Sequence, residues 1–147
     1  MTSVSVIIPT YNRAEMLAQV LPSYLQFAVV GEVLIVDDGC TDGTADLVAG
    51  LAQVDPRIKA LKHRVNQGMT YARNTGIQNA QGDLVLFSED DLALAPGSLD
   101  LLVAHMQQSG ADIIAGRRIW MRIGESQEQA LARADSRRWP VVNTRLM

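Results

Sequence analysis

The sequence lacks the features that mark several large classes of protein. Its single cysteine, Cys40, excludes an intramolecular disulfide framework. No apolar stretch approaches the roughly 20 residues of a membrane span, and none has the pattern of a signal peptide. Aromatic residues make up only 5% of the chain, and no basic stripe interleaved with aromatics is present, so nucleic acid is not an expected partner. These absences favour a protein of the reducing cytoplasm.

Glycine-rich phosphate loops are also missing. A nicotinamide-binding Rossmann domain would carry G-x-G-x-x-G after its first strand, but Pro9 to Arg13 contains no glycine, and no Walker glycine-lysine loop exists. A phosphorylatable receiver domain needs a lysine late in the chain, whereas no lysine follows Lys62. A nucleotidyltransferase stays open as a weaker alternative, although it would carry a glycine- and lysine-rich loop near its N-terminus.

The composition that is present suits one packed core, with 147 residues of which 48% are hydrophobic. The net charge of −3 is unevenly divided. Residues 1–116 carry 6 basic and 13 acidic residues (−7), whereas residues 117–147 carry 7 basic and 3 acidic ones (+4). We therefore divide the chain into a core, 1–116, and a basic C-terminal segment, 117–147. That segment is expected to be a solvated face, with peripheral association with an anionic membrane surface as the alternative.

Hydrophobic periodicity predicts strands that alternate with helices. Strands are expected at 4–8, 32–36, 58–61, 84–87 and 113–114, with a further strand at 117–123. Helices are expected through 16–25, where Pro22 should bend or end the helix, through 47–51, over 69–79, between Pro96 and Gly110, and over 127–134. This order predicts an α/β fold with a doubly wound, mostly parallel sheet flanked by helices.

Two of the predicted strands run directly into acidic residues. Strand 84–87, apolar enough to be expected buried on both faces, is followed by Glu89, Asp90 and Asp91, and strand 32–36 by Asp37 and Asp38. Two unit charges about 4 Å apart repel by roughly 4 kcal/mol at an effective dielectric near 20, so a positive group is expected there, with a divalent cation as the natural candidate. Because parallel strands end at the same edge of a sheet, both clusters should face one ligand.

Four segments in this order resemble the N-terminal, nucleotide-sugar-binding portion of glycosyltransferase family 2, which has the GT-A fold. They are VSVIIPTYNR at 4–13, VDDGCTDGT at 36–44, NQG at 66–68 with ARNTG at 72–76, and SEDD at 88–91. Cys40 stands where serine is common, and Glu89 takes the first acidic position of a DXD-type metal motif. The resemblance covers nearly all of residues 3–116.

The resemblance implies that the chain binds a nucleotide-sugar donor, with uridine diphosphate as the carrier and other nucleotides as the alternative. Asp38 would accept a hydrogen bond from the base, and Asp91 would hold Mg²⁺ or Mn²⁺ against the diphosphate, since hard oxygen ligands suit these ions. The nucleotide-binding residues that it implies are Pro9, Thr10, Tyr11, Asp38, Gly68, Arg73 and Asp90.

The implied reaction is inverting transfer of a sugar to an unknown saccharide, lipid or protein acceptor. In inverting members the acceptor half follows the metal motif, so 117–147 is expected to be the start of an incomplete acceptor half. Glu125, Glu128 and Asp135 have no orienting partner visible in the sequence, and the catalytic base is left unassigned. A module or fragment that binds donor without catalysis therefore stays open, as does a homodimer that covers the apolar surface of a half-completed sheet.

Structural roles are the alternatives for several residues. Asp38 could belong to a turn, Tyr11 could cover the edge of the core, and Arg73 could form an ion pair on a helix surface. Cys40 is expected to be inert. His63 and His105 lack metal-ligand spacing and are expected to have ordinary packing or surface roles. Three methionines are expected to fill the core, namely Met16, Met69 and Met106.

Overall fold

The computed structural model describes residues 2–116, 126, 128–130 and 132. The chain divides into two compact units, residues 1–94 and 95–147. A parallel sheet forms the centre of the first unit. Within the described residues the sheet has the order β3-β2-β1-β4, and every neighbouring pair is parallel. Its strands are β1 (Val4–Thr10), β2 (Val30–Asp37), β3 (Ile58–Lys62) and β4 (Leu84–Phe87).

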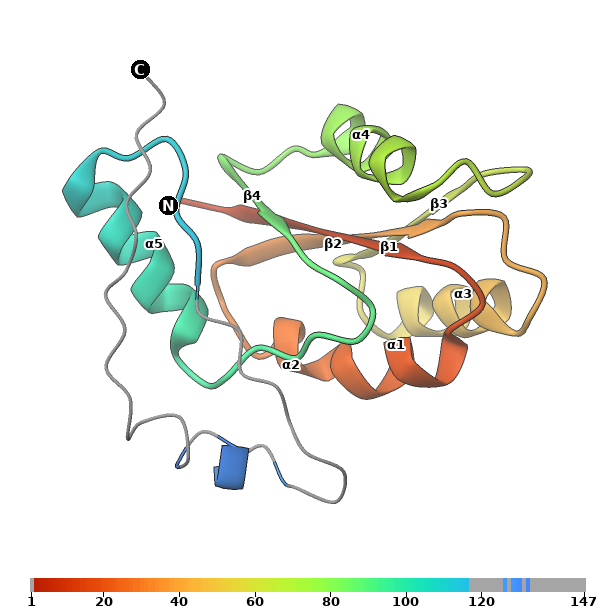
Figure 1. The fold of residues 1–147 in the computed structure, drawn as a ribbon, viewed down its shortest axis with the longest axis horizontal. Helices are drawn as coiled ribbons and strands as arrows, with labels where there is room; N and C mark the ends of the chain where they lie inside the picture. Colours follow the sequence, from red (N-terminus) through yellow and green to blue (C-terminus); the bar gives the residue numbers. More distant parts are fainter. Residues whose placement is uncertain (1, 117–125, 127, 131, 133–147) are drawn as a thin grey trace. The chain divides into compact units, whose positions relative to one another are not determined.

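Helices cover both faces of this sheet (Figure 1). One face carries α4 (Met69–Asn79), and the other carries α1 (Ala14–Val20), α2 (Pro22–Leu25) and α3 (Thr44–Val54). Pro22 ends α1 and opens α2, as expected from its missing N–H. The arrangement confirms the predicted doubly wound α/β architecture, and the bounds predicted for α4 are those observed.

The tight packing of α4 on the sheet depends on small side chains. Its buried residues are Ala72 and Gly76, and Ala72 joins Ile7, Leu34 and Val36 in one apolar cluster. A Cβ atom built on Gly76 would lie 2.4 Å from Cγ2 of Ile7, closer than real contacts allow. Glycine at this position therefore lets the helix approach β1 closely.

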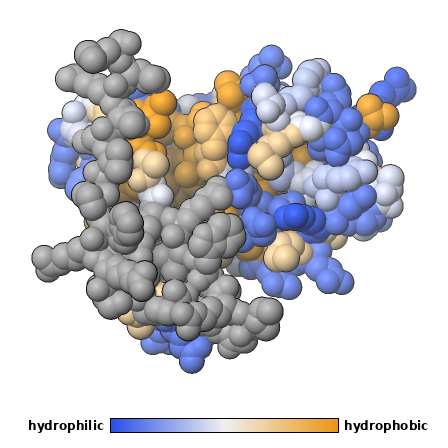
Figure 2. Space-filling view, in the orientation of Figure 1, coloured by the Kyte–Doolittle hydropathy of each residue, from blue (hydrophilic) through white to orange (hydrophobic). Residues whose placement is uncertain are grey.

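The prediction that strand 84–87 is buried on both faces is wrong. Within the described residues β4 lies at the edge of the sheet, and Val85 and Phe87 are 40% and 50% exposed. Phe87 pairs with Ile7, the residue beneath α4, so both exposed side chains lie on the α4 face but beyond the helix that covers it. Figure 2 shows hydrophobic side chains gathered over β4, in contrast to the hydrophilic surface over α4. A homodimer that covers this surface stays a prediction.

Three smaller expectations also need correction. The first strand, expected at 4–8, extends through Pro9 and Thr10, because both still pair with β2. Met16 and Met69 are exposed on the surface, so they do not fill the core. The strand expected at 113–114 is reduced to one isolated bridge at Ile113.

The second unit contains α5 (Ser98–Ser109), which begins after Gly97 and ends at Gly110, as predicted. The strand expected at 117–123 lies outside the described residues. Of the helix expected at 127–134, residues 128–130 and 132 are described and are helical. In the described part of the chain, every helix is too short or too polar to cross a membrane. The boundary at 116 stays a prediction.

Glu32 is a buried carboxylate at the start of β2 that ties three segments together. It accepts hydrogen bonds from Ser5 Oγ (2.5 Å), from the ammonium of Lys59 (2.6 Å) and from the backbone N–H of Gln81 (2.6 Å). Burial alone would raise the pKa of Glu32, but these donors outweigh it, and the pKa lies below its ordinary value. The ionised carboxylate therefore stabilises the start of the sheet.

We predict that protonation of Glu32 contributes to a fall in the free energy of unfolding at acidic pH. A carboxyl group whose pKa is lower in the folded than in the unfolded chain stabilises the fold at pH values above its unfolded pKa, about 4.3 for Glu. This contribution to the free energy of unfolding is lost as the pH falls through the pKa of the folded state. Urea unfolding over a pH series should show a shallower acid loss for Glu32→Gln than for the parent. Glu15→Gln, at an exposed position on α1, controls for the removed charge, and equal slopes for Glu32→Gln and the parent would contradict the role of Glu32.

Gly76→Ala should lower the free energy of unfolding by about 1–3 kcal/mol, because the added methyl group overpacks the interface with Ile7. The matched control is Gly50→Ala on α3, where a Cβ would meet nothing within 4 Å. That change should raise stability by roughly 0.5–1 kcal/mol through helix propensity. Urea denaturation measures both, and a neutral Gly76→Ala would show that Ile7 yields easily.

Candidate functional site

The carboxyl ends of β1, β2 and β4 bring both acidic clusters to one edge of the sheet. Thr10, the last residue of β1, pairs with Asp37 at the end of β2, and its carbonyl accepts the N–H of Asp38 at 3.0 Å. On its other side, Thr10 Oγ1 donates to Asp90 Oδ2 at 2.9 Å. Thr10 therefore links the two clusters, as expected for strands that end at a common edge.

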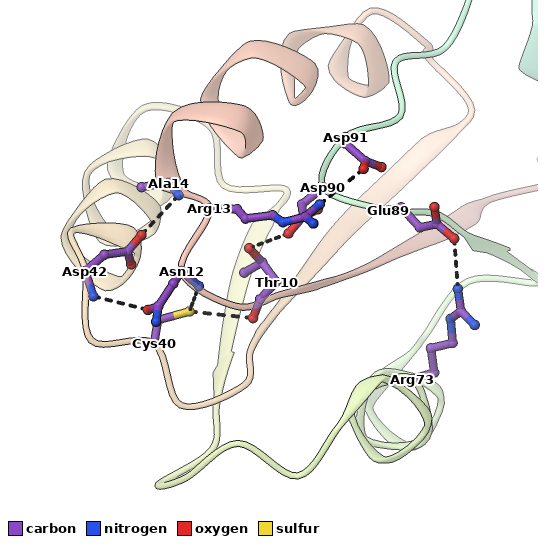
Figure 3. A network of polar contacts seen from close by, with 10 residues as sticks. All are labelled: Thr10, Asn12, Arg13, Ala14, Cys40, Asp42, Arg73, Glu89, Asp90 and Asp91. Carbon is purple, nitrogen blue, oxygen red and sulfur yellow. Dashed lines mark hydrogen bonds and ion pairs between the residues drawn. The ribbon is translucent and has the colours of Figure 1, made fainter. Parts of the chain in front are cut away.

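Two arginines pair with the three acids that follow β4 (Figure 3). Nη1 of Arg13 lies 3.2 Å from Asp90 Oδ1 and 3.1 Å from Asp91 Oδ2. Glu89 turns away from these two residues toward α4, where its Oε1 lies 3.4 Å from Nη2 of Arg73. Attraction to the charge of Asp90 raises the pKa of Arg13 above its ordinary value, so the guanidinium stays charged. The chain itself thus supplies part of the positive charge predicted beside these acids, through Arg13 and Arg73.

The loop that carries Arg13 is fixed by side chains. Asn12 has a φ of 53°, a left-handed conformation that asparagine tolerates. Its Oδ1 accepts the backbone N–H groups of Thr41 at 2.8 Å and Asp42 at 3.3 Å. Asp42 in turn accepts the N–H of Ala14 at 3.3 Å. The residues on both sides of Arg13 are therefore held against the loop after β2 (Figure 3).

Asp38 is buried and engaged by three donors. Its Oδ1 lies 2.7 Å from Nδ1 of His63 and accepts the N–H of Gln67 at 2.9 Å, and its Oδ2 accepts the N–H of Gly68 at 2.8 Å. Burial would raise the pKa of Asp38, but the hydrogen bonds from His63, Gln67 and Gly68 outweigh it and hold the pKa below its ordinary value. His63 also contacts Thr75 Oγ1 at 2.9 Å, so its packing role is to brace Asp38 against α4.

Two glycines shape the wall beside Asp38. A Cβ on Gly39 would lie 2.5 Å from the backbone carbon of Val65, and its φ of 78° is already left-handed. Gly68 has a φ of 88°, which side chains rarely adopt. These positions let the loop 63–68 fold directly over the end of β2.

Asp37 belongs to one of the predicted acidic clusters, but no individual role was predicted for it. Its carboxylate is buried, and Oδ1 accepts the N–H of Cys40 at 2.7 Å. Its Oδ2 has no hydrogen-bond partner, and the exposed ammonium of Lys62 lies 3.8 Å away. A buried carboxylate oxygen without a hydrogen bond is costly and uncommon, so it retains the capacity to accept one from a donor that reaches it. Its signal in the sequence was its place as the last residue of an apolar run.

The remaining expected residues lie around this edge. Pro9 is half-buried within β1, and Tyr11 follows the strand with its side chain exposed. Arg73 forms the ion pair with Glu89, while its Nε atom is buried without a hydrogen-bond partner. Burial raises the pKa of the Cys40 thiol, in keeping with an inert cysteine.

The acids after β4 suit a divalent cation only in part. Asp90 and Asp91 offer hard carboxylate oxygens, but no group of three or more His, Cys, Asp or Glu residues in the described part of the chain could hold a metal. Mg²⁺ commonly binds through one or two carboxylates together with substrate phosphates and water. The residues therefore fit a cation that a diphosphate helps to coordinate, and Asp90 and Asp91 would be its protein ligands.

Two solved structures share this fold. The mannosyltransferase PcManGT of Pyrobaculum calidifontis, solved with GDP-Man and Mn²⁺, superposes with a TM-score of 0.66 at 28% identity over 71% of this chain and 32% of its own. TarS of S. aureus, residues 1–349 with UDP-GlcNAc, gives a TM-score of 0.68 at 25% identity over 81% of this chain and 37% of its own. Both likenesses confirm the predicted GT-A-like fold.

Sequence relatives point the same way. An uncharacterized glycosyltransferase of Rickettsia conorii is 37% identical over 109 residues, which are 74% of this chain and 18% of the relative. A Campylobacter jejuni GalNAc(5)-diNAcBac-PP-undecaprenol beta-1,3-glucosyltransferase is 32% identical over 115 residues, 77% of this chain and 37% of its own. The chain thus spans well under half of either relative. The Glycosyl transferase family 2 profile matches residues 5–145, and the chain belongs to that family.

Proposed function

We propose that this chain forms the donor-binding part of a metal-assisted, inverting glycosyltransferase with a UDP-sugar as its donor. The observation that carries the proposal is the meeting of two acidic strand ends at Thr10, one with a buried acceptor that receives no hydrogen bond and one with two carboxylates beside each other. We assign the nucleotide base to the first end, as a proposed base slot, and the charged diphosphate with its cation to the second end.

Asp37 and Asp38 have different roles in the proposed base slot. Asp38 holds the backbone of Gln67 and Gly68, so it shapes the wall of the slot and keeps acceptor capacity only on Oδ2. Asp37 Oδ2, a buried acceptor that receives no hydrogen bond and lies 3.8 Å from the Lys62 ammonium, suits the imide N–H of a uracil ring. Pro9, Thr10 and Tyr11 lie at the neighbouring strand end and would line the same slot.

Asp91, with Asp90 beside it, would hold Mg²⁺ or Mn²⁺ against the diphosphate, and Arg73 would face the nucleotide with its planar donors. When bound, the cation would neutralise charge on the departing diphosphate. The chain's own residues then bind and orient the donor. The base that removes a proton from the acceptor is not assigned: Glu128 is described and exposed, whereas Glu125 and Asp135 lie outside the described residues.

Binding of uridine diphosphate should depend on a divalent cation and on Asp91. Calorimetry with Mn²⁺ should show binding that chelator abolishes, and Asp91→Asn should weaken it by roughly 10- to 100-fold, the range seen for groups that support a bound metal. Asp46→Asn, at an exposed position on α3, removes the same charge as a control. Equal affinity with Mn²⁺ and with chelator would contradict the metal role.

Asp37→Asn should weaken binding of uridine diphosphate by about 1–3 kcal/mol at an unchanged melting temperature, because an amide N–H then faces the donor of the base. Asp38→Asn should lower the melting temperature as well as the affinity, since the carboxylate accepts from two backbone N–H groups and contacts His63. Calorimetry and thermal unfolding of both variants separate the roles. Weak binding by Asp38→Asn at full stability, with parent-like binding by Asp37→Asn, would place the base contact at Asp38.

A further inference from the structure

Arg13 occupies the place between the two carboxylates to which the proposed function assigns a cation. One nitrogen, Nη1, lies 3.2 Å from Asp90 and 3.1 Å from Asp91. Figure 3 shows the guanidinium pointing from the start of α1 toward both acids. A guanidinium and a divalent cation both require carboxylate oxygens, so they compete for Asp91.

The two ion pairs of Arg13, with Asp90 and with Asp91, differ in how easily the guanidinium can be displaced from them. The Asp90 side chain is 9% exposed, and its second oxygen accepts the hydroxyl of Thr10 at 2.9 Å. The Asp91 side chain is 45% exposed and that of Arg13 is 53% exposed. An ion pair between half-exposed groups is weak, whereas a buried and doubly bonded carboxylate is held in place. Asp91 is therefore the partner that Arg13 can release.

The backbone of Arg13 has little freedom to move away with its side chain. Asn12 and Ala14 are bonded to the loop after β2 through Thr41 and Asp42. A guanidinium that releases Asp91 therefore stays within reach of the acidic edge. There it repels a bare divalent cation, but it can pair with the oxygens of a diphosphate, which suit its planar donors.

We propose that Arg13 is the internal counter-cation of Asp90 and Asp91, and that it makes the binding of divalent cation and diphosphate mutually dependent. The inference rests on the proposed function and adds a residue that couples the binding of the two ligands. A free cation must displace a positive group without compensation, whereas a cation that arrives with a diphosphate supplies the displaced guanidinium with a new anionic partner. By linkage, each ligand then raises the affinity of the other by the same factor.

The test is Mn²⁺ binding, followed by the electron paramagnetic resonance signal of free Mn²⁺, with and without uridine diphosphate. Arg13→Met should bind Mn²⁺ alone about two- to fivefold more tightly than the parent, the range expected for loss of a half-exposed ion pair. The gain in Mn²⁺ affinity on adding uridine diphosphate should shrink by a similar factor. Thermal unfolding in chelator checks that Arg13→Met is folded.

Two further variants test whether the positive charge at position 13, rather than the net charge of the chain, sets the affinity for Mn²⁺. Arg13→Lys keeps the positive charge and should bind Mn²⁺ alone like the parent. Arg64→Met removes one charge from an exposed arginine that forms no ion pair among the described residues, and it should also resemble the parent. If Arg13→Met binds Mn²⁺ alone no better than Arg64→Met, the inference is overturned.

The same measurement separates this inference from the proposed function. A parent that binds Mn²⁺ and uridine diphosphate together, with unchanged coupling in Arg13→Met, would overturn the role of Arg13 and leave the proposed function standing. A parent whose Mn²⁺ signal is unchanged by the protein, with or without uridine diphosphate, would overturn both.

Discussion

Crowded carboxylates at one edge of the sheet are the constraint on which the rest of the structure depends. Parallel strands bring the acids after β2 and β4 together, where like charges repel strongly unless each finds a donor or a cation. The structure meets this demand with loops, which are built to present N–H groups and arginines to the edge. Loop conformation here is thus a consequence of charge compensation.

The sequence predicted the parts of the fold that depend on local pattern. The periodicity of α4, the proline that ends α1 and the glycine that ends α5 each act within a few residues, and the structure confirms all three. The strand 84–87 shows the limit of this approach. An apolar run marks a strand, but its place at the centre or the edge of a sheet depends on which other strands pair with it.

The site was predicted less completely, because its chemistry depends on contacts between distant segments. Asp38 and Asp37 are neighbours of one type, and only the folded loop shows that Asp38 is satisfied by Gln67 and Gly68 while an oxygen of Asp37 is not. His63 has no ligand spacing, yet it braces Asp38. Arg13 lies 77 positions before Asp90, and sequence spacing gives no sign of that contact.

The partners of the acids divide them into two kinds. Asp38 and Asp42 accept from backbone N–H groups, which cannot leave without unfolding a loop, so these acids maintain the shape of the edge. Asp37 Oδ2 and Asp91 Oδ2 instead face the side chains of Lys62 and Arg13, which can release these oxygens at small cost, while Oδ1 of Asp37 stays bonded to the N–H of Cys40. Carboxylates of this second kind can exchange an internal cation for a ligand. An edge that combines both kinds can keep its shape while its charges change partners, which is what binding of a cation and an anion at one site requires.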